Sequence, residues 1–188
     1  MSRRIVGVAG APGVGKTTYA LRLVAESAAP AAYVPLDGFH LADVTLTALD
    51  RLDRKGAPDT FDAWGYAALL ARLRTETDHA VYAPGFQRDL EQPIAGAVTV
   101  PRETALVVTE GNYLLLDRPE WRAVRDQLDE VAFLVADDEV RRRRLVARHV
   151  QFGKTEAEAE AWVARVDDAN AALVAATRAR ADRVVEIA

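Results

Sequence analysis

The sequence predicts an α/β fold, in which a five-stranded parallel sheet carries helices on both faces. Short runs of β-branched and other apolar residues alternate with helical stretches along the 188 residues. The strand runs are continuously apolar, which is typical of parallel strands that are buried on both faces. Half of the residues are apolar, so the chain can bury a core. No repeat or linker interrupts the pattern, and we expect one domain over residues 1–188.

The first part of the chain predicts two strands and two helices in alternation. Residues 5–9 (IVGVA) form an apolar run, and residues 16–27 place apolar side chains on one helical face. Residues 31–36 form the second run, which an Asp-Gly pair ends. Residues 63–74 carry leucines at helical spacing, so we expect a helix that leads back to the sheet.

The second part repeats the alternation. Apolar runs at 105–109 and 131–136 predict strands on either side of a short helix at 121–128. An aspartate at 137 or 138 can cap an arginine-rich helix that extends to about residue 150. Early acidic residues favour a long alanine-rich helix that begins near residue 155.

Residues 82–101 break this alternation. The stretch contains three prolines and two glycines, which favour turns over a continuous helix or a central strand. We expect an irregular excursion or hairpin over the sheet edge, and such excursions often carry substrate contacts. A last strand at 184–187 completes the sheet.

Residues 10–17 (GAPGVGKT) match the pattern G-x-x-x-x-G-K-[ST] without a mismatch. The match follows a predicted strand and opens a predicted helix, as a phosphate-binding loop (P-loop) requires. Glycines let backbone N–H groups surround an anion, and the helix N-terminus adds positive potential. We expect Lys16 to reach the β- and γ-phosphates of ATP and Thr17 to ligate Mg²⁺. The predicted nucleotide-binding residues are Gly10, Ala11, Pro12, Gly13, Val14, Gly15, Lys16, Thr17 and Thr18.

This loop alone does not name a reaction, because GTP switches, motor ATPases and small-molecule kinases share the P-loop NTPase fold. The sequence has no N-K-x-D motif and no D-x-x-G motif after the third predicted strand, which disfavours a GTP switch. Motor ATPases usually need a longer chain.

Two carboxylates end predicted strands. Asp37 follows the second strand, and Glu110 ends the third. Because ligands bind at the carboxyl edge of an open α/β sheet, Asp37 can accept a proton from a substrate hydroxyl or help to hold Mg²⁺ through water. Glu110 occupies a Walker B-like position near Mg²⁺. The alternatives are a plain Asp-Gly turn at Asp37 and a solvated acid at Glu110.

Several segments resemble a known group of kinases. The phosphate loop, residues 37–40 (DGFH), 54–62 (RKGAPDTFD) and 110–111 (EG) together resemble the P-loop kinase group of bacterial pantothenate kinase, uridine kinase and phosphoribulokinase. Residues 83–93, 110–116 and 168–170 are most similar to the small bacterial "nucleoside/nucleotide kinase family", which includes fructose transport system kinase-like proteins. The resemblance covers nearly the whole chain.

The resemblance implies a kinase that moves the γ-phosphate of ATP onto a hydroxyl of a small molecule. By position, Asp37 is similar to the family's general base, and Glu110 to its carboxylate near Mg²⁺. Arg88 and Asn170 lie where relatives place contacts to substrate or phosphate. The chain is much shorter than pantothenate kinase, and it has DGFH where uridine kinases have a DSFY-type motif. The acceptor therefore stays open between a nucleoside, a sugar and a pantothenate-like alcohol.

The arginine-rich helix is expected to be amphipathic. At 100° per residue, Arg141, Arg144 and Arg148 share one face. Their spacing, followed by Gly153, resembles the lid of uridine kinases, so we expect a short helical lid over about 141–156. There Arg144 and Arg148 would be catalytic and neutralise charge on the phosphates in the transition state. A solvated helix face and a nucleic-acid-binding patch are the alternatives.

Smaller features add two candidates for contact with the acceptor. These are His40, which lies beside Asp37, and Tyr82, which begins the excursion. The three histidines have no ligand spacing, so we expect no histidine metal site. We expect the tryptophans to pack in the core or between helices; they are Trp64, Trp121 and Trp162.

Composition excludes several classes of protein. A net charge of −4 without a long basic tail argues against a nucleic-acid binder. No apolar run approaches the ~18 residues that span a bilayer, and the absence of cysteine excludes disulfides and thiolate metal sites. We expect a cytoplasmic protein whose partners are ATP and a small molecule, with no nucleic acid and no membrane. The resemblance leaves a homodimer open.

These observations together predict an ATP- and Mg²⁺-dependent small-molecule kinase. One alternative is a nucleotide-binding regulator or sensor ATPase that has no acceptor. The other is a nucleoside monophosphate kinase, for which Arg51, Arg54 and Arg88 would supply a basic acceptor pocket.

Overall fold

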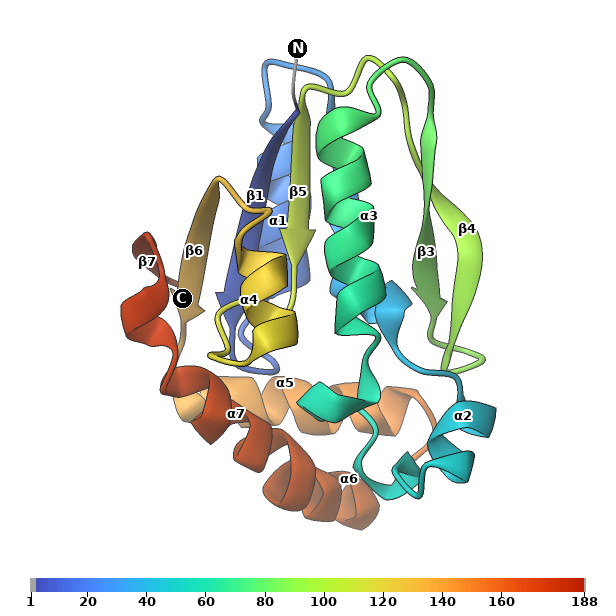
Figure 1. The fold of residues 1–188 in the computed structure, drawn as a ribbon. Coiled ribbons are helices and arrows are strands. Elements are labelled where there is room, and N and C mark those ends of the chain that lie inside the picture. Colours follow the sequence, from blue (N-terminus) through green and yellow to red (C-terminus); the bar gives the residue numbers. More distant parts are fainter. Residues whose placement is uncertain (1–2, 188) are drawn as a thin grey trace.

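The computed structural model of the protein describes residues 3–187. Its centre is a five-stranded sheet in the order β2-β5-β1-β6-β7 (Figure 1). Every neighbouring pair of strands in it runs parallel, which confirms the predicted fold class. The strands are β1 (Arg4–Gly10), β2 (Ala31–Pro35), β5 (Leu106–Glu110), β6 (Glu130–Val135) and β7 (Arg183–Glu186).

Helices cover both faces of this sheet (Figure 1). α1 (Lys16–Ala25) packs on one face, where Tyr19 joins Val8 and Val108 in an apolar cluster. α3 (Ala63–Thr75) and α4 (Pro119–Arg125) cover the other face and its larger core. Because helices shield both faces of the sheet from water, the central strands can carry apolar side chains on both faces, as the sequence predicts.

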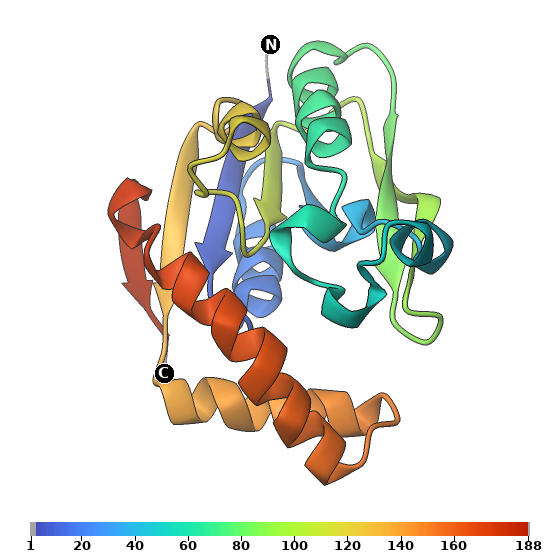
Figure 2. The same cartoon turned by 60° about the horizontal axis from the view of Figure 1, so that its bottom comes forward.

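Three helices cross the carboxyl ends of the strands, as Figure 2 shows. These helices are α5 (Asp138–Gln151), α6 (Glu156–Trp162) and α7 (Asp168–Ala175). Asp137 caps α5 with its carboxylate, and a capping box of Thr155 and Glu158 begins α6. Both helix starts agree with the sequence prediction.

A π-helical turn, Val163–Asp167, separates α6 from α7, where the sequence predicts one continuous helix. A π turn inserts an extra residue into the helical repeat and rotates the residues that follow it. Asp167 and Asn170 are both buried polar residues in or just after this turn. The turn therefore lets a mostly alanine-rich helix present polar side chains to the interior.

The excursion predicted at 82–101 is an antiparallel hairpin of β3 (Val81–Gln87) and β4 (Gln92–Val100). It packs against a 3₁₀ turn, Leu36–Phe39, that follows β2. A Cβ atom added to Gly38 would lie 2.2 Å from the carbonyl oxygen of Pro84, so only glycine permits this approach. The contact brings the hairpin close to Asp37.

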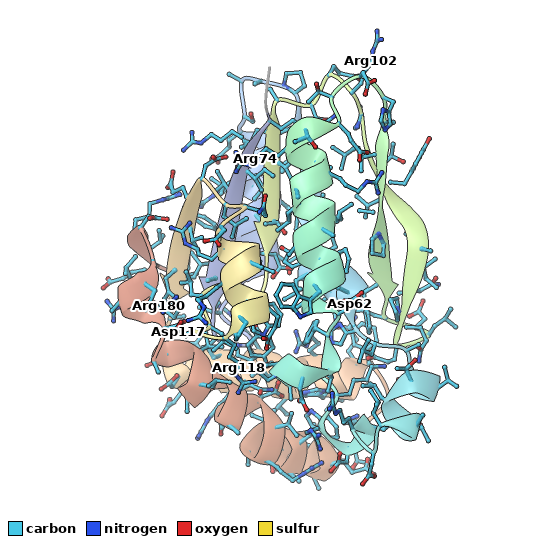
Figure 3. The ribbon with its side chains drawn as sticks, viewed as in Figure 1. Asp62, Arg74, Arg102, Asp117, Arg118 and Arg180 are labelled. Atoms are coloured by element: carbon cyan, nitrogen blue, oxygen red, sulfur yellow. The ribbon has the colours of Figure 1, made fainter. Side chains whose placement is uncertain are left out.

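The connection from β2 to α3 consists of short helical turns. α2 (Asp43–Ala48) follows the first 3₁₀ turn, and two more 3₁₀ turns, Leu52–Arg54 and Pro58–Thr60, lead to α3. Asp62 caps α3 by accepting from the N–H of Gly65 at 2.8 Å (Figure 3). Within residues 3–187, no helix is both long and apolar enough to cross a bilayer.

The prediction for the tryptophans is wrong for Trp64. Trp121 is fully buried, whereas Trp64 is 60% exposed. The inner face of α3 is formed by Ala63, Tyr66 and Leu70, and Trp64 is rotated away from it by one helical step of about 100°. Trp162 lies at the wall of a cleft described below.

Arg3 is a buried cation that joins three segments. Its guanidinium donates to the backbone carbonyls of Leu73, Glu76 and Pro101 at 2.7–3.0 Å, and more weakly to Thr104 and Arg102. The residue is 1% exposed. Arg3 therefore ties the end of α3 and the segment after β4 to the start of β1.

Replacing Arg3 by methionine is expected to destabilise the fold by about 3 kcal/mol, because several buried carbonyls lose their donor. Urea unfolding followed by circular dichroism measures the change. Arg4→Met is the matched control, since the Arg4 side chain forms an exposed ion pair with Glu130, worth at most ~1 kcal/mol. Equal losses in the two variants would contradict the role assigned to Arg3.

Candidate active site

A cleft of about 530 Å³ lies at the carboxyl ends of the strands. Its walls come from the loop after β1, the 3₁₀ turn after β2, the hairpin turn, the end of β5, and the helices α5 to α7. This is the edge where open α/β sheets bind ligands. The structure thus brings residues from distant parts of the sequence to one concave surface.

The loop of residues 10–17 has the backbone of an anion cradle. Gly10, Gly13 and Gly15 all have positive φ angles, of 149°, 78° and 97°. Helix α1 begins at Lys16, within the last residues of the loop, and has no acidic residue in its first turn. The positive end of the helix dipole therefore faces the cleft without a carboxylate from that turn to oppose it.

Lys16 is 8% exposed and lies in the cleft. Its Nζ donates to the carbonyl of Ala11 at 3.1 Å. Burial lowers the pKa of Lys16 from its ordinary value to about 8, although the charges of Glu110 and Asp37 oppose this. The site therefore holds a poorly solvated cation, which a phosphate group would stabilise.

Glu110 lies at the floor of the cleft and is 5% exposed. Its Oε1 accepts hydrogen bonds from Thr17 Oγ1 at 3.3 Å and from the Tyr33 hydroxyl at 2.8 Å. Burial and the charge of Asp37 raise the pKa of Glu110, while Lys16 and the two hydrogen bonds act in the opposite direction. Tyr33 is a residue that our sequence analysis did not identify.

Asp37 lies in the 3₁₀ turn after β2 and lines the cleft. Its Oδ2 accepts from Arg88 Nη2 at 3.0 Å. Arg88 comes from the turn of the hairpin, 51 residues away, and its guanidinium lies 5.8 Å from the ring centre of Phe86. The two side chains are about one-third exposed, so this ion pair remains accessible from the cleft.

His40 lies beside Asp37 between two aromatic rings. The ring centres of Phe61 and Phe86 are 4.1 Å and 4.8 Å from the ring centre of His40. Burial lowers the pKa of His40, so its neutral form is favoured. His40 Nδ1 lies 2.8 Å from the carbonyl oxygen of Asp37. A carbonyl oxygen only accepts, so Nδ1 carries the proton.

The arginines of α5 divide into three roles. Arg141 is 5% exposed and donates to the carbonyl of Pro12 at 2.7 Å, so it supports the phosphate loop. Arg144 and Arg148 line the cleft, and burial together with the charge of Arg88 lowers the pKa of Arg148. Arg142 is exposed and pairs with Asp168 at 2.7 Å, as expected for a surface residue.

Asn170 lines the cleft, and its Nδ2 lies 3.5 Å from the carbonyl of Gly56. Tyr82, by contrast, is 61% exposed and does not line this cleft, so the prediction that it contacts the acceptor is not supported by its position. Side chains alternate along β3, and Tyr82 lies on the outer face because Val81 and Ala83 are buried.

The cleft also contains residues that the sequence analysis did not select. Lys55 Nζ pairs with Asp43 Oδ1 at 2.6 Å, and His149 Nε2 lies 2.9 Å from Asp167 Oδ2. Trp162 lies in the same wall, with Lys154 4.9 Å above its ring centre. Lys55 and Lys154 are two of only three lysines in a chain with many arginines. This scarcity of lysine is the feature of the sequence that could have marked them as candidates for the site.

The comparisons with known proteins agree with this geometry. The profile of the Phosphoribulokinase / Uridine kinase family matches residues 5–188. A Schizosaccharomyces pombe protein described as a "putative uridine kinase" is 33% identical over 171 residues, which cover 85% of this chain and 72% of the relative. Escherichia coli protein YggC is 33% identical over 192 residues, 98% of this chain and 78% of its own.

A solved structure extends the similarity to three dimensions. The crystal structure of a "putative fructose transport system kinase" from Silicibacter sp. TM1040 superimposes with a TM-score of 0.90 at 37% identity. The match covers 98% of this chain and 90% of the other. The predicted resemblance is thereby confirmed. The chain belongs to the Phosphoribulokinase / Uridine kinase family, and it is an ATP-dependent small-molecule kinase with a P-loop fold.

Proposed function

We propose that the protein transfers the γ-phosphate of ATP to a hydroxyl group of a small metabolite. The observation that carries this proposal is the position of Asp37, which shares one cleft with Lys16 and the phosphate loop. A carboxylate across from a phosphate site can accept the proton of an attacking hydroxyl. Acceptors of three kinds fit the proposal: nucleosides, sugars and pantothenate-like alcohols.

The nucleotide side of the site uses the loop and Lys16. The backbone N–H groups of residues 11–18 and the start of α1 would bind the phosphates, and the Lys16 ammonium would pair with their negative charge. Thr17 and Glu110 supply oxygen donors, which Mg²⁺ prefers, at a separation of 3.3 Å. Bound there, Mg²⁺ would neutralise charge on the transferred phosphate.

The acceptor side uses Asp37 and Arg88. The acceptor hydroxyl passes its proton to the Asp37 carboxylate while its oxygen attacks the γ-phosphorus. The bond between that phosphorus and the β,γ-bridging oxygen breaks, and ADP leaves. Arg88 holds Asp37 Oδ2 at 3.0 Å and so fixes the orientation of the carboxylate before the acceptor binds.

Arg144 and Arg148 would complete the site from the lid over residues 141–156. Both line the cleft, and a Cβ atom added to Gly15 of the loop would lie 4.0 Å from Arg144 Nη1, so they can stabilise negative charge that develops on the phosphoryl oxygens. Arg141 anchors their helix to the loop through Pro12. Such a site acts by positioning and electrostatics rather than by a covalent intermediate.

His40 and Asn170 are the proposed contacts for the rest of the acceptor. Because His40 Nδ1 carries the proton toward the Asp37 carbonyl, Nε2 keeps a lone pair. That nitrogen can accept from a second hydroxyl of the acceptor. Asn170, which lines the same cleft, can both donate and accept.

The two alternatives are less well supported. A nucleoside monophosphate kinase would use Arg51, Arg54 and Arg88 for the acceptor phosphate. Arg54 pairs with Asp59 at 3.0 Å and Arg51 donates to the Asp59 carbonyl, and neither of these two lines the cleft. Arg88 does line the cleft, but it is paired with Asp37. A sensor that only binds ATP would need no Asp37–Arg88 pair at the edge of the phosphate site.

An ADP-release screen tests the proposal. The panel contains nucleosides, sugars and pantothenate-like alcohols, with nucleoside monophosphates as a separate arm. We expect an alcohol to raise ADP release above basal hydrolysis and to yield a phosphate ester that mass spectrometry detects. Stimulation by monophosphates alone would favour the monophosphate kinase, and ATP binding without any stimulation would favour the sensor.

A further inference from the structure

The Tyr33 hydroxyl forms the shorter of the two hydrogen bonds to Glu110. It donates to Oε1 at 2.8 Å, and Thr17 Oγ1 donates to the same oxygen at 3.3 Å. A carboxylate only accepts, so both hydroxyls are donors. The carboxylate of Glu110 is therefore held through one oxygen by two hydroxyl groups, one from β2 and one from α1.

The sheet register explains why Tyr33 reaches Glu110. Pro35 is paired with Glu110, and Tyr33, two residues earlier, is paired with Val108. Side chains two residues apart in a strand lie on the same face, so Tyr33 and Glu110 both lie on the α1 face of the sheet. Tyr33 packs there against the apolar cluster that contains Val108. Its partly buried ring packs against this cluster, while its hydroxyl reaches Glu110, which lines the cleft.

The direction of the Thr17 bond is also informative. Thr17 gives its hydroxyl hydrogen to Glu110, so its oxygen lone pairs remain available for a cation. Glu110 thus orients Thr17, and Tyr33 orients Glu110. The three side chains form a chain of contacts that begins in the core and ends at the start of α1.

We propose that Tyr33 is a positioning residue for magnesium-bound ATP, which holds Glu110 in the orientation that the ion requires. This inference rests on the proposed roles of Thr17 and Glu110. Tyr33 itself touches neither nucleotide nor ion. Without its hydroxyl, the weaker Thr17 bond alone restrains Oε1, and the incoming ion has to order the carboxylate as it binds.

The test is Tyr33→Phe, which removes one oxygen and keeps the ring. Isothermal titration calorimetry measures ATP binding once with Mg²⁺ and once with EDTA. We expect the variant to bind metal-free ATP with native affinity. We expect the increase in ATP affinity that Mg²⁺ causes to be about 10-fold smaller than in the native protein, a typical effect of removing a partner of a metal ligand. In steady-state kinetics, the Mg²⁺ concentration for half-maximal rate should rise by a similar factor, with little change in kcat at saturating Mg²⁺.

Tyr19→Phe is the matched control. Tyr19 belongs to the same apolar cluster, but its hydroxyl accepts from Arg183 at 3.2 Å, whereas that of Tyr33 donates to Glu110. If Mg²⁺ increases ATP affinity equally in Tyr33→Phe and Tyr19→Phe, the proposal is overturned. Loss of metal-free ATP binding in Tyr33→Phe also overturns it, because Tyr33 would then support the loop as a whole.

Glu110→Gln separates this inference from the proposed function. We expect Glu110→Gln to lose more of the Mg²⁺-dependent gain than Tyr33→Phe. If Glu110→Gln loses part of the Mg²⁺-dependent gain in ATP affinity and Tyr33→Phe loses none, only the role of Tyr33 fails. If neither variant changes the Mg²⁺ response, the metal role of Glu110 fails, and the inference fails with it.

Discussion

Replacing Asp37 by asparagine is expected to lower kcat by about 10²–10⁴-fold, the usual contribution of a general base. Asparagine has nearly the same shape, but its amide cannot take up the proton of the acceptor hydroxyl. The nucleotide contacts that we propose come from the loop after β1 and from α1, so ATP affinity should change little. Steady-state kinetics with the acceptor found in the screen, together with calorimetry of ATP binding, measures both quantities.

Asp117→Asn provides the control for this substitution. Asp117 is exposed at the surface, where it pairs with Arg122 and Arg180 away from the cleft (Figure 3). Its replacement should leave kcat within about 2-fold, as for an exposed ion pair of small energy. Full turnover by Asp37→Asn would remove Asp37 as the base, and the Arg88 pair would then have to be explained by substrate binding alone.

The sequence predicts well those features that a continuous stretch of residues determines. The phosphate loop is one unbroken motif, and the strands β1, β2, β5 and β6 follow apolar runs, whereas β7 is a short strand whose valines are flanked by charged residues. Their observed bounds differ from the predicted ones by about one residue, which is the ordinary uncertainty at strand ends. Asp37 and Glu110 could be predicted because each directly follows or ends such a run.

The features that it predicts poorly depend on how separate elements are placed. Tyr33 contacts Glu110 only because β2 pairs with β5 in a particular register. Asp167 lines the cleft at the end of the π turn, and the alanine-rich sequence around Val163–Asp167 gives no sign of that turn. Tyr82 was proposed as an acceptor contact because it begins the excursion, and such excursions often carry substrate contacts. As a strand residue between the buried Val81 and Ala83, it has to point outward.

Lys16→Ala is expected to lower kcat/KM for ATP by about 10²–10³-fold, a typical cost of removing one preorganised charge from a transition state. Lys16→Arg should not restore activity, because a planar guanidinium cannot replace a compact ammonium in a site that is already close-packed. Arg22→Ala is the control on the same helix, since Arg22 is exposed and lies 3.9 Å from Glu26.

The pH dependence of kcat/KM for ATP provides a second readout for Lys16. Burial lowers the pKa of Lys16 to about 8, so the free enzyme loses this positive charge as the pH rises through that value. Because kcat/KM reports the free enzyme, it should fall above about pH 8, and this descending limb should be absent in Lys16→Ala. A limb that persists unchanged in Lys16→Ala would assign the titration to another group. The buried cation would then be only a structural feature of the loop.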